Sequence, residues 1–337
     1  MGLYVRIKKK YDDFLLDVEF DCEQGIFALL GASGSGKSCT LKCIAGIDRP
    51  DEGKIILDGV VLFDSEKRIN LPPQKRHIGY MFQEYALFPN MTVAQNIVAG
   101  LPKGQNREEV LARYLEMFEL GGLENTYPHK LSGGQKQRVA MARMLVAGPK
   151  VLLFDEPLSA LDSHLRYGIE RELKKYLDQI NIPAIYVSHS RDEIYRMCSH
   201  IACLNNGKSE KTCAVRDFFK NPGTVNGARL SGCKNIAAFE RRSKSEIFVP
   251  EWNTNIVFAG PVPEDVQYVG LRAHYLQADK NNCDNSIIVD TYEITDDLFE
   301  WNIVIGKLTW KLAKTNDNIP RIPEMLYFNS ADVIFLK

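Results

Sequence analysis

Residues 31–38 read GASGSGKS and fit the phosphate-loop pattern G-x-x-x-x-G-K-[ST]. The apolar run at 26–30 predicts a short buried strand before the loop, and residues 39–45 predict a helix after it. In this setting the glycines let backbone N–H groups turn inward around phosphate oxygens at a helix N-terminus. Lys37 is predicted to reach the β- and γ-phosphates of a nucleotide, and the Ser38 hydroxyl to hold Mg²⁺. The candidate nucleotide contacts here are Gly31, Ala32, Ser33, Gly34, Ser35, Gly36, Lys37, Ser38 and Cys39.

The alternative to a phosphate-binding loop is a Gly-rich turn that binds nothing. Polar residues that follow two apolar runs later in the chain disfavour this alternative. KVLLFDE at 150–156 predicts a buried central strand of a parallel sheet that ends in two acids. Because α/β sheets bind ligands beyond the carboxyl ends of their strands, Asp155 is a candidate to hold Mg²⁺, directly or through water. Glu156 is a candidate to orient or deprotonate an attacking water. The apolar run at 184–188 ends just before His189, a candidate contact to the γ-phosphate.

Residues 131–145, LSGGQKQRVAMARML, combine a Ser-Gly-Gly turn with apolar residues at helical spacing. Ser132, Gly133 and Gly134 open the predicted helix, and its free backbone N–H groups offer a second place to meet a phosphate. An ordinary capped helix start is the alternative. It explains Ser132 but not the two successive glycines.

An aromatic side chain shortly before the phosphate loop is a candidate for stacking on adenine. Residues 3–9 and 14–20 predict two antiparallel strands joined through residues 11–13. Tyr11 is the first candidate and Phe14 the second. A hairpin aromatic without a ligand is the alternative.

Residues 84–97, EYALFPNMTVAQNI, place several large apolar side chains in a short segment that a proline interrupts. We expect Tyr85, Leu87, Phe88 and Met91 to be exposed beside this loop. Such a group indicates either a partner surface or a buried satellite cluster.

Length and composition limit the possible classes of protein. A chain of 337 residues predicts two domains, and 45% hydrophobic with 25% charged residues is typical of globular proteins. The net charge of −1 gives no global basic field for nucleic acid. No apolar run approaches the roughly 18–20 residues of a membrane helix, and the charged N-terminus is unlike a secretory signal, so we expect a cytoplasmic protein. The eight cysteines include no C-x-x-C pair, which favours reduced thiols over a zinc site.

The chain changes character after FFKNP at 218–222. Short apolar stretches separated by Pro, Asn and Gly predict a small β-barrel or OB-like domain. The predicted strands are 249–258, 267–276, 287–294, 301–312 and 326–336.

A series of motifs in this order resembles the ATP-binding cassette ATPases over roughly residues 3–220: GASGSGKS, Gln83, LSGGQ, VLLFDE, SALD at 159–162 and His189. The resemblance implies an α/β fold of the P-loop NTPase class. Its parts are a RecA-like core, an antiparallel β subdomain and a helical subdomain that carries LSGGQ. ATP and Mg²⁺ are the implied ligands, and ATP hydrolysis is the implied activity.

The resemblance also implies individual roles. Tyr11 would stack on adenine, Gln83 would sense Mg²⁺ and the γ-phosphate, and Glu156 would be the catalytic base. Asp162 would lie at a dimer seam and His189 would act as a switch. Cys39 departs from the family, whose members often carry a hydroxyl residue there, and this weakens one phosphate contact. The implied catalytic residues are Glu156, His189 and Gln83, the metal ligands Ser38, Gln83 and Asp155, and the further nucleotide contacts Tyr11, Ser132, Gly133, Gly134, Gln135 and Asp162.

The same resemblance implies partners. The LSGGQ loop lies too far along the fold to reach its own phosphate loop, and the family forms head-to-tail dimers in which this loop closes over ATP on the other subunit. A homodimer is therefore expected. Residues 84–97 resemble the region of solute importers that takes the coupling helix of a membrane permease. Two permease subunits docking at residues 83–91, an indirect extracytoplasmic solute-binding protein, no nucleic acid and a place on the cytoplasmic face of the membrane are expected.

The expected domains are a nucleotide-binding domain at 1–222 and a β-rich regulatory domain of TOBE/MOP type at 223–337. YVGLRAHYL at 268–276 is similar to the G-[IL]-R-x-x-x-L segment of regulatory domains in importer ATPases. The most similar family by overall look is the molybdate-importer ATPases, with sulfate importers next. The alternatives are import of sulfate or thiosulfate, tungstate, a sugar, a polyamine or iron, or a soluble cassette ATPase without transport. Candidate oxyanion contacts, with solvated side chains as the alternative, are Arg229, Lys234 and Arg272.

Overall fold

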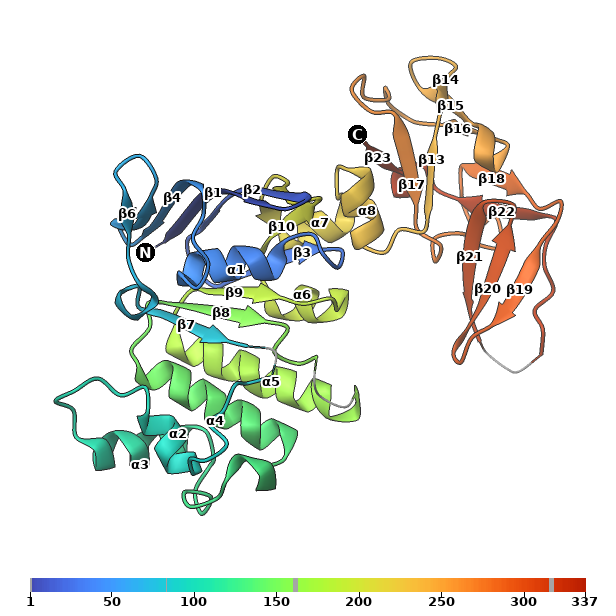
Figure 1. Ribbon diagram of the computed structural model, residues 1–337. Helices are drawn as coiled ribbons and strands as arrows, with labels where there is room; N and C mark the ends of the chain where they lie inside the picture. The colour runs from blue at the N-terminus through green and yellow to red at the C-terminus, as the bar shows by residue number, and fades with distance from the viewer. Residues whose placement is uncertain (1, 83, 160–162, 315–317) are drawn as a thin grey trace. The chain divides into compact units, whose positions relative to one another are not determined.

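The computed structural model describes residues 2–82, 84–159, 163–314 and 318–337 (Figure 1). The chain forms two compact units that divide between residues 216 and 217. No helix in the described ranges is long and apolar enough to cross a membrane.

The first unit is built on one large mixed sheet, which has twelve strands over the described residues. Neighbouring strands follow the order β6-β5-β4-β1-β2-β11-β10-β3-β9-β8-β7, and β12 pairs with β10. The strands are β1 (Leu3–Tyr11), β2 (Phe14–Cys22), β3 (Ile26–Gly31), β4 (Glu52–Leu57), β5 (Val60–Asp64), β6 (Ile69–Asn70), β7 (Ile78–Met81), β8 (Val151–Asp155), β9 (Ala184–Val187), β10 (His200–Asn205), β11 (Lys208–Ser209) and β12 (Cys213–Ala214).

This sheet has an antiparallel part and a parallel part. β1 pairs antiparallel with β2 and with β4, so the predicted hairpin of residues 3–9 and 14–20 is confirmed. β10, β3, β9, β8 and β7 run parallel, and every residue of β3 and β9 is buried, as in a parallel sheet with both faces covered. Because these strands run the same way, the residues that follow β3, β8 and β9 all emerge where the strands have their carboxyl ends, which we call the sheet edge. That edge carries the phosphate loop, the two acids and His189.

Helices cover the parallel part of the sheet and form a cluster beside it (Figure 1). α2, α3 and α4 pack against one another, as expected for a helical subdomain. Capping boxes begin α2 at Thr92 and α4 at Ser132. The helices of this unit are α1 (Lys37–Ala45), α2 (Val93–Val98), α3 (Arg107–Met117), α4 (Gly133–Val146), α5 (Ser163–Ile180) and α6 (Arg191–Met197), and α7 (Val215–Lys220) spans the division between the units.

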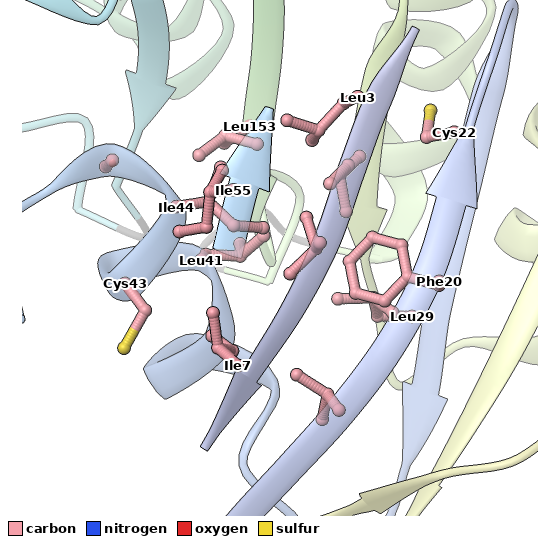
Figure 2. Packing of buried hydrophobic residues seen from close by; sticks show 14 of the residues in the cluster. Leu3, Ile7, Phe20, Cys22, Leu29, Leu41, Cys43, Ile44, Ile55 and Leu153 are labelled. Atoms are coloured by element: carbon pink, nitrogen blue, oxygen red, sulfur yellow. The ribbon is translucent and has the colours of Figure 1, made fainter. Parts of the chain in front are cut away.

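A hydrophobic core ties the phosphate-loop helix to both parts of the sheet (Figure 2). Leu41 and Ile44 lie three residues apart on α1 and are fully buried. They belong to one cluster with Ile7 of β1, Leu29 of β3 and Leu153 of β8. Burying one such side chain contributes about 1.5–3 kcal/mol, so packing fixes the position of α1 and of the loop before it.

The second unit is a small all-β domain, as predicted, with one α-helix among its described residues besides α7, namely α8 (Val225–Leu230). Its antiparallel sheets have the orders β13-β17-β23, β14-β15-β16, β18-β22 and β19-β20-β21. The strands are β13 (Asn235–Ala238), β14 (Glu240–Arg241), β15 (Glu246–Val249), β16 (Thr254–Val257), β17 (Tyr268–Leu271), β18 (Asn285–Ile288), β19 (Glu293–Asp296), β20 (Glu300–Ile305), β21 (Leu308–Ala313), β22 (Met325–Phe328) and β23 (Ile334–Leu336).

Four of the five strands predicted in this unit are each divided between two observed strands. The range 249–258 holds the last residue of β15 and all of β16, and 287–294 holds the end of β18 and the start of β19. The other two ranges, 301–312 and 326–336, contain turns. Residues 301–312 form the hairpin of β20 and β21, which turns at Gly306 with a φ of 57° that glycine adopts without strain. Residues 326–336 form β22 and β23, separated by a 3₁₀ turn at Ser330–Asp332. In both cases apolar residues continue on either side of the turn, so the hydrophobic pattern alone does not show the break.

Candidate nucleotide site

The phosphate loop connects β3 to α1, and its glycines are required by backbone shape and by close neighbours. Gly34 and Gly36 have φ values of 76° and 103°, in the region that favours glycine. A Cβ atom on Gly36 would lie 2.6 Å from a methyl group of Leu16 and 2.9 Å from the ring of Phe14. A Cβ on Gly31 would lie 2.4 Å from the Ser35 hydroxyl. The loop therefore tolerates no side chain at these close approaches.

Lys37 lies at the start of α1 and is buried inside the loop, with 5% of its surface exposed. Its Nζ donates to the backbone oxygens of Gly31 and Ala32, both at 2.9 Å. Burial lowers the pKa of Lys37, while the nearby carboxylates of Glu156 and Asp155 raise it. A buried ammonium needs anionic or carbonyl partners, and phosphate oxygens suit it at least as well as these carbonyls.

The Ser35 hydroxyl gives a second sign of a ligand in this loop. Its oxygen is buried and has no hydrogen-bond partner among the described residues. A buried polar atom without a partner is costly, and a phosphate oxygen or water would satisfy it. The residues of the loop therefore fit a nucleotide phosphate.

Ser38 and Asp155 come together although they are far apart in sequence. Ser38 Oγ donates to Asp155 Oδ1 at 2.9 Å, and the hydroxyl of Tyr80 donates to Asp155 Oδ2 at 3.0 Å. Burial and then the charge of Asp155 raise the pKa of Tyr80 well above its usual value, so the phenol stays protonated and remains a donor. Hydroxyl and carboxylate oxygens are the hard ligands that Mg²⁺ prefers, so this pair fits the predicted metal.

Glu156 and His189 also meet at the sheet edge. His189 Nε2 lies 2.5 Å from Glu156 Oε1, and the His189 side chain is about half exposed. Glu156 has a φ of 51°, uncommon for a residue with a side chain. Its N–H donates to the Val187 oxygen at 3.0 Å, and Ser159 Oγ donates to its oxygen at 2.8 Å, so local bonds hold this conformation. Strained residues of this kind cluster at functional sites.

A pocket of about 220 Å³ lies beside Glu156 and His189. Ser188, Arg166 and Glu193 also line it. Glu193 is buried and accepts from Ser188 Oγ at 2.6 Å, and Arg166 Nη1 lies 4.0 Å from its other oxygen. The sequence analysis missed these groups, although Ser188 directly precedes His189 and was an available signal.

The LSGGQ turn is a capped helix start in the described chain. Ser132 Oγ accepts from the Gln135 N–H at 3.3 Å, and Gln135 Oε1 accepts from the Ser132 N–H at 2.9 Å. Ser132 is exposed, and Gly133 begins α4. A Cβ on Gly134 would come within 3.1 Å of Ile169, so this glycine allows close packing on α5. The alternative reading of a helix cap thus describes the turn in one copy of the chain.

The two candidate adenine aromatics differ in their contacts. The Tyr11 hydroxyl donates to Asp48 Oδ2 at 3.2 Å, and Lys9 Nζ lies 5.0 Å from the centre of its ring. Phe14, whose ring centre is 6.1 Å from that of Tyr11, packs beside Gly36 of the loop. Both rings are therefore near the phosphate-loop helix.

The expectation that all four apolar residues of segment 85–91 are exposed is wrong for Tyr85, which is buried, and for Leu87, which is half-buried. Only 6% of Tyr85 is exposed, and its hydroxyl donates to the Pro157 oxygen at 3.2 Å. Phe88 and Met91 are exposed, and Leu87 is half-buried. The physical reason is that Tyr85 finds a carbonyl partner next to Glu156, so its ring turns inward.

Two polar side chains fix the shape of this segment. Arg143 of α4 donates to the oxygens of Tyr85 and Ala86, at 3.0 and 2.9 Å, and its guanidinium lies 5.1 Å from the centre of the Phe88 ring. Asn96 of α2 accepts from the Phe88 N–H at 2.9 Å and donates to the Phe88 oxygen at 3.1 Å. The segment is thus tied directly to the helix that begins with LSGGQ.

A pocket of about 780 Å³ extends from the metal pair to this segment. Its lining includes Ser38, Asp155, Tyr80, Leu87 and Lys136. The predicted site residues Gln83 and Asp162 lie outside the described residues, as does part of the SALD motif. The parallel sheet, its glycine-rich loop and the acids at its edge define a P-loop nucleotide-binding protein.

Comparisons with known proteins narrow this class. The profile of the family described as ABC transporter matches residues 15–159. The chain is 40% identical over 220 residues to the "Molybdenum import ATP-binding protein ModC" of Paramagnetospirillum magneticum, covering 64% of this chain and 60% of that protein. It is 37% identical over 252 residues to the ModC protein of Rhizobium etli, covering 72% and 70%. It is 42% identical over 224 residues to the "Fe(3+) ions import ATP-binding protein FbpC" of Haemophilus influenzae, covering 65% and 63%.

Solved structures agree with this relationship. The dimeric post-hydrolysis structure of the ATP-binding cassette MJ0796 with ADP and Pi covers 64% of this chain and 99% of its own, with 29% identity and a TM-score of 0.52. The cbiO1 structure from Clostridium perfringens covers 64% and 90%, with 27% identity and a TM-score of 0.57. The chain therefore belongs to the ABC transporter family and carries its ATP-binding cassette. It aligns with about 60% of the length of the first of the curated relatives above.

Proposed function

We propose that this chain is an ATPase subunit that hydrolyses ATP to drive import of a small solute, a molybdate-type oxyanion, through a membrane permease. The observation that carries the proposal is the meeting of two pairs at one sheet edge, Ser38 with Asp155 and Glu156 with His189. Both pairs lie beside a buried loop lysine. This combination provides phosphate binding, metal binding and a base within one site.

Lys37 and the loop N–H groups would bind the phosphates. Lys37 would exchange its bonds to the Gly31 and Ala32 oxygens for β- and γ-phosphate oxygens. The N–H groups of residues 32–39 and the start of α1 would surround the remaining oxygens. Tyr11, with Phe14 beside it, would stack on the adenine ring.

Ser38 and Asp155 would hold Mg²⁺, with Gln83 as a further ligand. When bound, this ion neutralises charge on the β- and γ-phosphate oxygens. Glu156 would accept a proton from the attacking water, which it orients toward the γ-phosphate. His189 would hold the Glu156 carboxylate through their short contact and would contact the γ-phosphate.

Residues 132–135 would complete the site of a second copy. The exposed Ser132 hydroxyl and the N–H groups of Gly133 and Gly134 would meet the γ-phosphate held by the other subunit, with Asp162 near the seam. A solved relative of the cassette, at 29% identity, is described as dimeric, which supports a homodimer.

The exposed and half-buried part of segment 85–91 would receive two permease subunits. Leu87, Phe88 and Met91 offer apolar area to a membrane-protein helix, and Arg143 links this surface to α4. The protein would then lie on the cytoplasmic face of the membrane, with a solute-binding protein as an indirect partner.

Molybdate is proposed as the solute because several relatives are named as molybdenum importers. A relative named as an Fe³⁺ importer keeps iron as an alternative, with sulfate, thiosulfate, tungstate, a sugar and a polyamine. A regulatory role for residues 223–337, with residues 1–222 as the nucleotide-binding domain, is part of the proposal. Arg272 is not a good candidate for the anion contact of this regulatory role, because its guanidinium donates to the oxygens of Ser231 and Phe219. Arg229 and Lys234 are exposed and remain candidates.

Uptake by cells that lack this gene tests the proposal. Cells grown with limiting molybdate, sulfate or iron would be assayed for the corresponding element, with the wild-type chain or Glu156→Gln supplied in trans. We expect molybdenum uptake to fail and only the wild-type chain to restore it. Loss of sulfur or iron uptake instead would select an alternative solute. Normal uptake of all solutes would contradict a transport role.

A further inference from the structure

Tyr80 reaches the metal-holding acid from the edge strand of the sheet. Its hydroxyl donates to Asp155 Oδ2 at 3.0 Å across 75 positions of sequence, while Ser38 donates to Oδ1 at 2.9 Å. Each oxygen of this carboxylate is therefore held by a different element, α1 on one side and β7 on the other.

Strand register explains why the phenol arrives at this point. β7 runs parallel to β8, with Tyr80 opposite Leu153. Residues two apart on a strand share a face, so Tyr80 lies on the same face as Asp155. The ring of Tyr80 packs against the main hydrophobic cluster and lies 4.4 Å from the ring of Phe82, centre to centre. Packing thus fixes the position from which the hydroxyl donates.

We propose that Tyr80 is a positioning residue for the Asp155 carboxylate, an inference that rests on the proposed ATP–Mg²⁺ site. In a loaded site the Ser38 hydroxyl would be a metal ligand, so its bond to Asp155 would rearrange. The Tyr80 hydroxyl is not a proposed metal ligand, so its bond to Asp155 can remain when the metal binds. This hydroxyl holds Oδ2 and leaves Oδ1 beside Ser38, with which Oδ1 would hold the metal ion. Partners that orient a metal-binding group typically contribute 10–100-fold to metal affinity.

The competing account makes Tyr80 only a core aromatic. Tyr80→Phe separates the two accounts, because it keeps the ring and removes the hydroxyl. A matched control is Tyr186→Phe on β9, which removes a buried hydroxyl that donates to Glu193 Oε2 at 3.3 Å. The metal probe is Mn²⁺, followed by electron paramagnetic resonance, with a non-hydrolysable ATP analogue and the full chain.

We expect Tyr80→Phe to weaken Mn²⁺ binding about tenfold. Affinity for the analogue in EDTA and the thermal midpoint should stay near wild type, and Tyr186→Phe should bind Mn²⁺ normally. In an Asp155→Asn background, Tyr80→Phe should have no further effect, because the group that it positions is gone.

Wild-type Mn²⁺ affinity in Tyr80→Phe, or an equal further loss in the Asp155→Asn background, would overturn the positioning role and leave the proposed function standing. Equal weakening by Tyr186→Phe would also overturn it, since any lost buried hydroxyl would then suffice. Failure of the wild-type chain to bind the analogue with Mn²⁺ would instead refute the proposed site itself.

Discussion

The edge of the parallel sheet and the LSGGQ turn, both in the first unit, are built in opposite ways. At the sheet edge, polar groups from distant parts of the chain pair with one another, as Ser38 does with Asp155 and Glu156 with His189. At the turn, Ser132 and Gln135 hydrogen-bond to each other within their own helix cap, and Ser132 is exposed. Within one copy of the chain, folding therefore brings distant polar groups together at the sheet edge, whereas the hydrogen bonds at the turn are local. We propose that the turn meets a nucleotide held by a second copy of the chain.

Glu156→Gln gives the largest effect expected at the sheet edge. The amide cannot accept a proton from water, and loss of a general base typically costs 10²–10⁴ in rate. ATP binding should persist, and a trapped dimer should appear by size-exclusion chromatography with ATP. The exposed Glu172→Gln on α5 is the matched control and should hydrolyse ATP normally. Wild-type ATP turnover by Glu156→Gln would show that Glu156 is not the catalytic base.

Segment 85–91 sharpens the comparison, because the buried Tyr85 and the half-buried Leu87 lie two residues apart. Tyr85→Ala should lower the free energy of unfolding by about 3–5 kcal/mol, since it empties a buried site. Leu87→Asp should change it by less than about 1 kcal/mol but abolish assembly with the permease. Denaturant unfolding and co-purification of the permease measure the two effects. Insolubility of Leu87→Asp would show that this residue is core and not surface.

The smallest effect concerns the second unit. Titration of the full chain with molybdate, tungstate and sulfate should release heat with the transported oxyanion, and Lys234→Ala should reduce it. Burial lowers the pKa of His274, and the nearby cations Lys311, Lys234 and Arg272 lower it further. Glu300 contacts both His274 and Lys311 and offsets part of this positive charge. No heat with any of the three ions would leave this unit as a structural or dimerisation module.

The sequence predicts the sheet edge well, because each of its residues follows an apolar run at a strand end. The phosphate loop, Asp155, Glu156 and His189 therefore all emerge where the parallel strands require. The proposed role of Tyr80 is not predicted in this way, because Tyr80 lies inside a strand and its position depends on the register of β7 with β8. Apolar periodicity predicts a strand here, but it does not show which residue of a distant strand lies opposite Tyr80.

The burial of Tyr85 and the hairpin at Gly306 were missed for related reasons. An apolar residue in a loop is compatible with both exposure and burial, and the deciding contact, the Pro157 oxygen, lies 72 positions away. The chain at 301–312 keeps alternating apolar residues on both sides of its turn. In each case a partner distant in sequence, or a local backbone angle, determines the outcome.

We propose that each nucleotide site takes its halves from two copies of the chain, and mixed dimers provide the decisive test. Ser132→Arg and Lys37→Ala subunits with different tags would be co-expressed, purified through both tags and assayed for single-turnover ATP hydrolysis. Each variant alone should lose about 10²-fold or more in rate, as when a transition-state donor is removed. The mixed dimer should recover hydrolysis, because both defects fall in one site and the other is intact. A mixed dimer as inactive as its parents would contradict the claim.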